Sequence, residues 1–372
     1  GGLITFSLNV APRIAYRKNA SWDVFRNAVE ANPTTPIMDP KDPSLYYNFK
    51  GQAAGYNPLE LLKKDKSTGT TKLLDWDGTV KLNLLPLLLN KEDRQTLTTQ
   101  LTFADHQYDN YNQWFRPSTS TLAINAGREG EASQDYSKSA IRTLEWVTNY
   151  ANSFGNHNFK VMAGYSYQYE QYSGLNAANK DFPNDALEDN NLGSGTYAKD
   201  EGELGMGSYK NDSKLISFFG RVSYDWKGRY MLTASLRHEG SSKFGEHHKW
   251  GNFPAISAGW RISDEAFMAG TKSWLTDLKL RGDFGITGNQ SFDSYRSLNT
   301  MSGFGYYLYN GKYYQVWGPG KNVNPDLRWE KGQNWNVGLD WTLFGGDLYG
   351  SFNYYSRKQQ DLLCDSNVSV PP

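Results

Sequence analysis

The chain has 372 residues, and its 39 lysines and arginines equal its 39 aspartates and glutamates in number. A formally neutral chain gives no electrostatic reason to expect nucleic acid as a partner. Its longest apolar run, 82–89, contains Asn83 and Pro86 and falls well short of the ~18 residues that a membrane helix needs. The single cysteine excludes a disulfide framework within the chain. The 25 tyrosines and 12 tryptophans are residue types that gather at lipid–water interfaces.

In chain order, alternation of apolar and polar residues predicts five β-strands in the first half of the chain. They cover about 4–17, 71–88, 96–117, 136–152 and 159–169. A long excursion, 18–70, follows the first strand and carries a predicted short helix at 22–30 and a proline-rich run. The other connections are a polar turn at 90–93, a loop at 126–134, a tight turn at 154–156 and a long polar loop at 173–208.

The second half of the chain predicts six more strands. Four lie between 217 and 290, at about 218–226, 230–237, 254–262 and 278–287, and a final hairpin covers 335–343 and 348–354. Each strand has one apolar face and one polar face, and the polar face carries charged side chains. In a membrane barrel such a face lines a wet lumen. The residues predicted to face the lumen are Arg221, Arg237, Arg261, Arg281, Asp283 and Asp340.

The lengths of the connections alternate along these eleven strands. Long loops follow the odd strands, chiefly 18–70, 173–208 and 291–324, and short turns or a compact segment follow the even ones. Bacterial outer-membrane barrels show this parity, with short periplasmic turns and long extracellular loops, whereas a soluble sandwich has no reason to keep it. The pattern therefore predicts an all-β, antiparallel transmembrane barrel with its long loops outside the cell.

Aromatic residues concentrate in the loop at 291–324. Aromatic rings offer large rigid faces, so these residues are candidates for stacking on a substrate's sugar rings. The alternative is a β-ribbon whose rings pack on one another or meet a partner protein. The candidate substrate-binding residues are Tyr306, Tyr307, Tyr309, Tyr313, Tyr314 and Trp317.

No catalytic, cofactor or metal motif is found in the sequence, so we expect a protein that is not an enzyme. There is no nucleophile elbow and no His-Glu-x-x-His run. His247 and His248 are adjacent, so their side chains point to opposite sides of a strand and are poorly placed to share an ion. The acidic loop at 181–189 lacks the ligand spacing of an EF-hand, and a loose calcium site there is the weaker alternative.

Several runs resemble the barrel of SusC/RagA-type TonB-dependent outer-membrane transporters. They are FGRVSY at 219–224, YMLTASLR at 230–237, GSSKFG at 240–245, FPAISAGWRI at 253–262, LKLRGDFGITGNQ at 278–290 and NPDLRWE at 324–330. The resemblance implies a 22-stranded barrel in a bacterial outer membrane, gated by a plug on which the TonB energy-coupling protein pulls. It also implies a SusD-like surface lipoprotein as a lid, and import of a large nutrient, either a glycan or a peptide.

The sequence departs from that family pattern in one respect. It shows no plug and only about half of the strands, so we expect it to be an internal portion of such a transporter. We also expect its first and last strands not to pair, and the chain alone not to transport. Two other functions remain open at this stage, a passive outer-membrane porin and an outer-membrane barrel enzyme.

Overall fold

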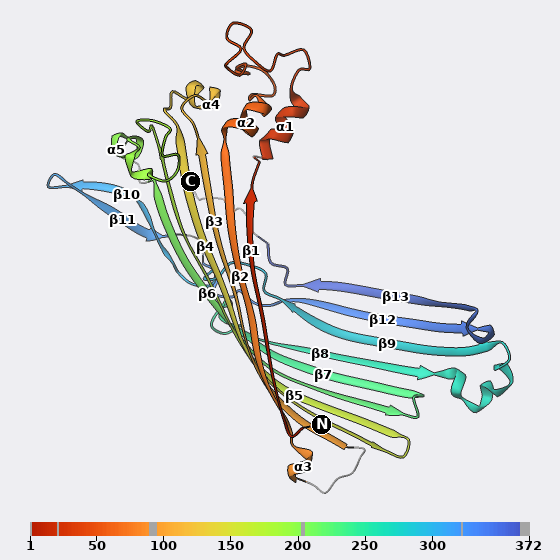
Figure 1. Ribbon diagram of the computed structural model, residues 1–372. Coiled ribbons are helices and arrows are strands. Elements are labelled where there is room, and N and C mark those ends of the chain that lie inside the picture. The colour runs from red at the N-terminus through yellow and green to blue at the C-terminus, as the bar shows by residue number, and fades with distance from the viewer. Residues whose placement is uncertain (1, 21, 89–94, 202–204, 321–322, 365–372) are drawn as a thin grey trace, which may run out of the picture.

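The computed structural model describes residues 2–20, 22–88, 95–201, 205–320 and 323–364, and its main feature is one antiparallel sheet (Figure 1). Neighbouring strands follow the order β1-β2-β3-β4-β5-β6-β7-β8-β9-β12-β13. The strands of this sheet are β1 (Ile4–Lys18), β2 (Lys66–Asn83), β3 (Gln95–Arg116), β4 (Glu131–Phe154), β5 (His157–Lys180), β6 (Met206–Trp226), β7 (Tyr230–Ser241), β8 (Trp250–Arg261), β9 (Leu275–Asn289), β12 (Glu330–Leu343) and β13 (Leu348–Gln360). The predicted all-β class and the eleven strands are thus confirmed.

The strand register keeps the predicted faces continuous across the sheet. Residues directly opposite each other on neighbouring strands share a face. One such row runs from β6 to β13 and contains Trp226, Tyr230, Trp260, Leu280, Leu339 and Phe352. We call the side that carries this row the apolar face and the opposite side the polar face.

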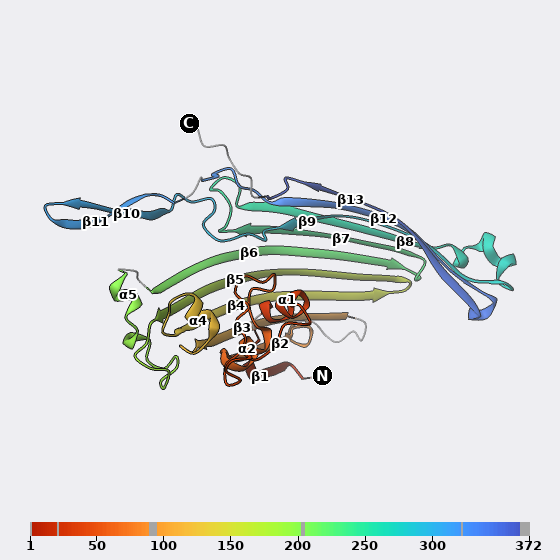
Figure 2. The ribbon, with the colours of Figure 1, turned by 90° about the horizontal axis from the view of Figure 1, so that it is seen from above.

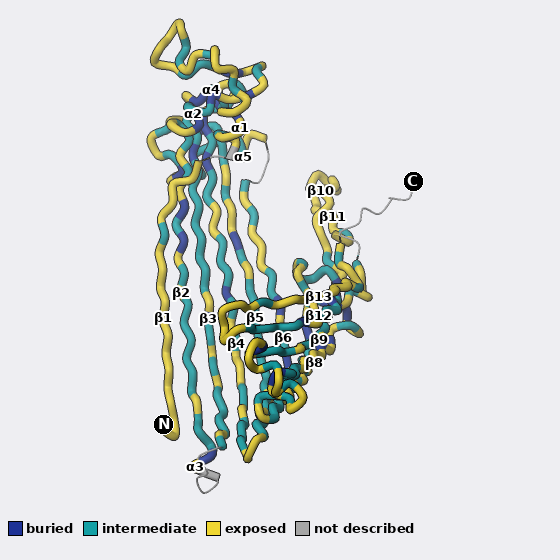
Figure 3. Tube along the Cα trace, turned by 90° about the vertical axis from the view of Figure 1, so that its right-hand side faces the viewer, coloured by how far each residue is buried: buried dark blue, intermediate teal, exposed yellow. Residues whose placement is uncertain are grey.

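The apolar face is exposed instead of packed into a core. Phe6, Leu8, Trp146 and Leu236 lie on it with exposed fractions of 74%, 69%, 54% and 50%. Figure 3 shows that β1 is exposed along almost its whole length. A soluble sandwich would bury such a face against a second sheet, so this sheet needs an apolar surrounding on that side.

The connections after odd strands gather at one end of the sheet, which we call the long-loop rim. Helices α1 (Trp22–Glu30), α2 (Pro58–Lys64), α4 (Thr121–Asn125) and α5 (Tyr197–Asp200) lie at this end, in the upper part of Figure 1. Asn48 and Asn125 exchange amide hydrogen bonds of 2.7 and 2.9 Å across two of these loops. Between two further loops, the amide of Gly245 donates to Leu327 O at 3.0 Å. The predicted sharing of one rim is confirmed, as is the helix predicted at 22–30.

The opposite end, the short-turn rim, joins the even strands to the strands that follow them. The amide of Lys227 donates to Asn156 O, and that of Phe344 donates to Trp274 O, both at 2.8 Å. These bonds tie neighbouring turns together. The turn predicted at 90–93 lies outside the described residues.

Several predicted boundaries are wrong. The loop predicted at 173–208 is shorter, because β5 continues to Lys180 and β6 begins at Met206. The excursion after β1 likewise ends where β2 begins, at Lys66. The strand predicted to reach residue 88 ends at Asn83, where Pro86 lacks the N–H that a ladder needs and α3 (Leu85–Leu88) forms instead. The segment 291–324 contains a separate two-stranded sheet, β10 (Met301–Tyr309) and β11 (Lys312–Pro319).

The main sheet is open. β1 and β13 stand at the two ends of the strand order, and Figure 2 shows them on opposite sides of the molecule. The expectation that the first and last strands do not pair is therefore confirmed. Among the described residues, none of the helices is both long enough and apolar enough to cross a membrane.

Candidate functional site

The structure places all six residues predicted to face the lumen on the polar face. Arg221 lies opposite Ser235, and Asp283 lies opposite Ser257 and Asn336. Regular alternation along each strand puts Arg237, Arg261, Arg281 and Asp340 on the same side. These side chains are spread along the sheet, so they form a lining and not one compact binding site.

The best-ordered part of this lining lies on β9, β12 and β13. Arg281 holds Asp340 with two parallel hydrogen bonds, Nε to Oδ2 at 2.9 Å and Nη2 to Oδ1 at 3.2 Å. Its Nη2 also donates to Asn353. Asp283 accepts a hydrogen bond of 3.1 Å from Asn336. Bidentate arginine–carboxylate pairs fix side-chain geometry, so this region presents an ordered polar surface.

Two further arginines are paired along the polar face. Arg237 donates to Glu239 Oε1 through Nε at 2.9 Å and Nη2 at 2.7 Å, and the same Nη2 reaches Ser217 at 2.7 Å. Arg261 lies 3.3 Å from Asp277. For Arg221, by contrast, no ion-pair partner lies among the described residues. A lining of paired charges is polar without a strong net field.

The six aromatic candidates lie on the hairpin β10–β11, which projects from the long-loop rim (Figures 1 and 2). The pairing divides them between the two sides of the ribbon. Tyr307, Tyr309 and Tyr314 share one side and contact each other, with ring centroids 6.1 to 6.4 Å apart. Tyr306, Tyr313 and Trp317 share the other side, with exposed fractions of 69%, 70% and 59%. The hairpin is thus a two-sided aromatic ribbon, and the alternative interpretation, rings packing on one another, holds for its first side.

An aromatic cluster anchors the base of this hairpin to the sheet. Phe244, Phe253 and Trp329 are buried together, and Phe292 packs against them. The three buried residues, Phe244, Phe253 and Trp329, belong to the runs at 240–245, 253–262 and 324–330. Gly245 completes the contact, since a Cβ there would lie 1.7 Å from Pro325 O and only glycine allows the two backbones to approach so closely.

A charged network that the sequence did not reveal joins other parts of the long-loop rim. Arg116 bridges Asp65 (Nη2 to Oδ2, 2.7 Å) and Glu131 (Nη1 to Oε2, 3.3 Å), and Lys180 reaches Glu131 at 3.5 Å. Burial raises the pKa of Asp65, and the Arg116 guanidinium opposes that rise. Asp65 and Arg116 are 51 residues apart, so no local pattern signals the pair.

The acidic loop at 181–189 also forms hydrogen bonds and ion pairs with neighbouring parts of the long-loop rim. Asp185 accepts hydrogen bonds from the amide and hydroxyl of Ser118, at 3.0 and 2.8 Å. Asp181 pairs with Arg128 at 3.0 Å, and Glu188 pairs with Lys66. Within the described ranges, no three histidine, cysteine or acidic side chains lie close enough together to hold a metal ion.

Two aromatic bands mark the levels at which the apolar face begins and ends. Trp226, Tyr230 and Trp260 stack near the short-turn rim, with centroid distances of 5.5 and 6.4 Å. Near the other rim, Phe218 contacts Tyr165 at 5.2 Å. Trp226 and Phe218 are eight residues apart on β6, about 26 Å along the strand, or about 20 Å in height at a strand tilt of about 40°. Outer-membrane barrels have an apolar band about 25 Å tall between two aromatic girdles.

An exposed apolar face between aromatic bands, a charged opposite face and long loops on one rim define a class. The sheet is a wall of a membrane-spanning β-barrel. The chain belongs to the family described as TonB dependent receptor-like, beta-barrel, whose model matches residues 18–370.

Curated relatives and solved structures agree with this membership. TonB-dependent receptor P3 of Formosa agariphila is 33% identical over 253 residues, which cover 67% of this chain and 24% of that relative. TonB-dependent receptor SusC of Bacteroides thetaiotaomicron is 28% identical over 380 residues, covering 92% of this chain and 34% of SusC. The structure of the RagAB peptide transporter matches with a TM-score of 0.76 at 18% identity, over 99% of this chain and 40% of that chain, a likeness that shows the fold. This chain thus spans about a third or less of the length of these curated relatives.

Proposed function

We propose that this chain forms part of the wall of a TonB-dependent transporter that imports a large nutrient across a bacterial outer membrane. One observation carries the proposal: a continuous apolar face lies back to back with a charged face, and the long loops share one rim. Family membership supports the dependence on TonB, and the likeness to SusC supports nutrient uptake. In this reading the long-loop rim faces outside the cell, and no residue of the chain is catalytic.

The substrate is proposed to be a glycan or a peptide, met first at the aromatic ribbon of β10–β11. Exposed tyrosine and tryptophan rings supply rigid apolar contact area at a low entropic cost, for sugars and for peptide side chains alike. Tyr306, Tyr313 and Trp317 offer the open side of the ribbon. A SusD-like surface lipoprotein is the proposed partner on this rim, and TonB is the proposed partner on the periplasmic side.

The test compares uptake by cells that carry the intact protein, its deletion and two variants. We expect uptake of the cognate oligosaccharide or peptide to disappear on deletion and on collapse of the proton gradient. Tyr313→Ala combined with Trp317→Ala removes the open aromatic side and is expected to lower the affinity for substrate. Trp274→Ala, an exposed tryptophan at the short-turn rim, is the matched control.

Two alternatives give different results in the same assay. A passive porin would continue to pass the solute after the proton gradient collapses. An outer-membrane enzyme would release a modified product outside the cell. Either result would replace the proposal of energised import.

A further inference from the structure

Beyond the upper aromatic band, the side of the sheet that carries the apolar face presents two rows of outward-facing cations. On the first row, Arg142 of β4 and Lys214 of β6 lie on either side of Tyr169 of β5. On the second row, Lys138 and Lys210 flank Ser173 in the same way. All four cations share the face of Phe218, because each lies an even number of residues from a member of the apolar face on its own strand.

Strand geometry fixes the size of this cationic surface. Two strand spacings separate the cations of one row, about 10 Å between their strands, and four residues separate the rows, about 13 Å along the strand. The first row also lies four residues beyond Phe218 on β6. With a strand tilt of about 40°, that places it about 10 Å above the upper aromatic band. This is the level of lipid headgroups, whose layer borders the hydrocarbon core.

Three carboxylates lie on the same face as the four cations, so these seven groups together carry one net positive charge. On the β3 side, Arg142 lies 3.8 Å from Asp105, and Lys138 lies 3.9 Å from Asp109. Asp212, between the two lysines of β6, accepts a hydrogen bond from the Tyr295 hydroxyl. Among the described residues, no carboxylate lies within ion-pair distance of Lys210 or Lys214, and both side chains are exposed.

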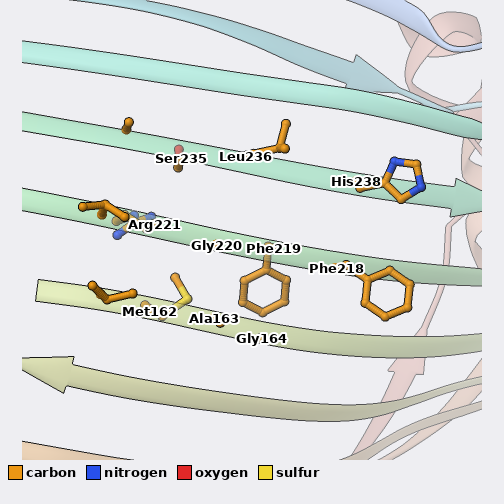
Figure 4. Close-up of a pocket in the computed structure, with 13 residues that line it drawn as sticks. Met162, Ala163, Gly164, Phe218, Phe219, Gly220, Arg221, Ser235, Leu236 and His238 are labelled. Atoms are coloured by element: carbon orange, nitrogen blue, oxygen red, sulfur yellow. The ribbon is translucent and has the colours of Figure 1, made fainter.

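An apolar groove of about 710 Å³ lies below these rows on β5, β6 and β7 (Figure 4). Its lining includes the small residues Ala163, Gly220 and Ala234 beside the larger Phe218 and Leu236. A Cβ added at Gly220 would make only an ordinary contact, 3.5 Å from Met162 O, so the space is open. Lys214 and Gly220 are six residues apart, about 20 Å along the strand, which is the reach of one acyl chain.

We propose that this part of the apolar face is a binding site for a phosphorylated lipid of the outer leaflet. The first cation row holds a phosphate at headgroup level, the second row meets further anionic groups of a larger headgroup, and one acyl chain lies in the groove around Gly220. The proposal rests on the proposed function in one respect, the assignment of the long-loop rim to the outside. Positive charge alone would suit free phosphate, but the continuity of the rows with the apolar groove selects a lipid.

The test measures lipid binding to the intact protein, purified in detergent and stripped of lipid, by native mass spectrometry. The probes are lipid A with two phosphates, with one phosphate and with none. Arg142→Gln with Lys214→Gln is expected to weaken both phosphorylated forms about thirtyfold, given about 1 kcal/mol per cation near a membrane surface and about 1.4 kcal/mol per tenfold change. Lys138→Gln with Lys210→Gln is expected to weaken only the form with two phosphates.

The groove has its own variant and the cations have a matched control. Gly220→Val fills the groove and is expected to weaken all three lipids about tenfold, as displacing one or two methylenes would at about 0.8 kcal/mol each. Lys160→Gln with Lys279→Gln removes two cations from the polar face and is expected to leave lipid binding unchanged. A millimolar excess of inorganic phosphate is not expected to displace the lipid.

The outcomes separate this proposal from the transport proposal. Heat-modifiable migration and recovery in the outer membrane show first that each variant is folded and inserted. Equal loss of binding in the polar-face control, equal affinity for phosphorylated and dephosphorylated lipid A, or displacement by free phosphate would each overturn the lipid site. None of these results depends on uptake, so loss of transport with normal lipid binding would count against the transport proposal alone.

Discussion

Replacing Trp329 by alanine is expected to release the two loops that meet at the base of the aromatic hairpin. The indole is 3% exposed, its ring lies 4.6 Å from Phe244 and 5.2 Å from Phe253, and its N–H donates to Lys249 O at 2.9 Å. Truncating a buried tryptophan to alanine costs about 3–5 kcal/mol. A loss of about 4 kcal/mol raises the open population of these loops roughly a thousandfold, at about 1.4 kcal/mol per tenfold change.

Hydrogen exchange of the Gly245 amide measures this opening, because that N–H is bonded to Leu327 O across the two loops. We expect its exchange to accelerate by about three orders of magnitude in Trp329→Ala, if local opening carries the full loss. The matched control is Trp317→Ala, the same change at a side chain that is 59% exposed, and it is expected to leave the rate unchanged. A wild-type exchange rate in Trp329→Ala would refute the anchoring role of the cluster.

Three other predictions concern the rims and the membrane face. Arg116→Ala leaves the buried Asp65 carboxylate unpaired and is expected to destabilise the long-loop rim by about 3–5 kcal/mol in denaturant unfolding at neutral pH. Because burial raises the pKa of Asp65, this loss should shrink as the pH falls through that raised value, and a pH-independent loss would contradict the assignment. Ile256→Lys, on the apolar face, is expected to cost about 2–4 kcal/mol in lipid, against little for Ser257→Lys beside it on the polar face; equal costs would invert or abolish the two faces. At the short-turn rim, hydrogen bonds from the Tyr230 hydroxyl and the Trp260 indole lower the pKa of Glu265. The ionised carboxylate therefore stabilises this turn at a pH above the ordinary glutamate pKa, and that stabilisation is lost as the pH falls through the lowered pKa. Hydrogen exchange of the turn's amides should therefore accelerate at acid pH in the wild type, and this acceleration should disappear in Glu265→Gln. If it persists in the variant, another group causes it.

The sequence alone predicts the faces of the sheet because lipid on one side and water on the other impose a period of two. From β6 to β13 the alternation is regular, and apolar residues of three predicted strands, Leu232, Ile256 and Leu280, lie on one face. The same reasoning misses the ends of β5 and β6. There Ser173 and Lys210 lie on one face, but water wets both faces above the membrane, so the alternation disappears although the ladder continues.

The side-chain contacts within the long-loop rim cannot be predicted from the sequence for a different reason. Asp65 and Arg116 are 51 residues apart, and Phe253 and Trp329 are 76 residues apart. Each pair meets only because strand pairing brings distant parts of the chain together. Turn residues and aromatic runs identify the loops but not their partners. The aromatic ribbon is intermediate, since the sequence identifies its residues while the pairing alone shows that they divide between two sides.

Site-by-site accessibility along β8 tests the two-faced wall most directly. Single spin-labelled cysteines at 254–261, in the intact protein with Cys364 replaced by serine, report exposure to dissolved oxygen in lipid and to a water-soluble relaxation agent. We predict strict alternation, with labels at Ile256, Ala258 and Trp260 contacting lipid and labels at Ser257 and Arg261 contacting water. Equal access of the water-soluble agent to both sets, or the opposite phase, would contradict the account.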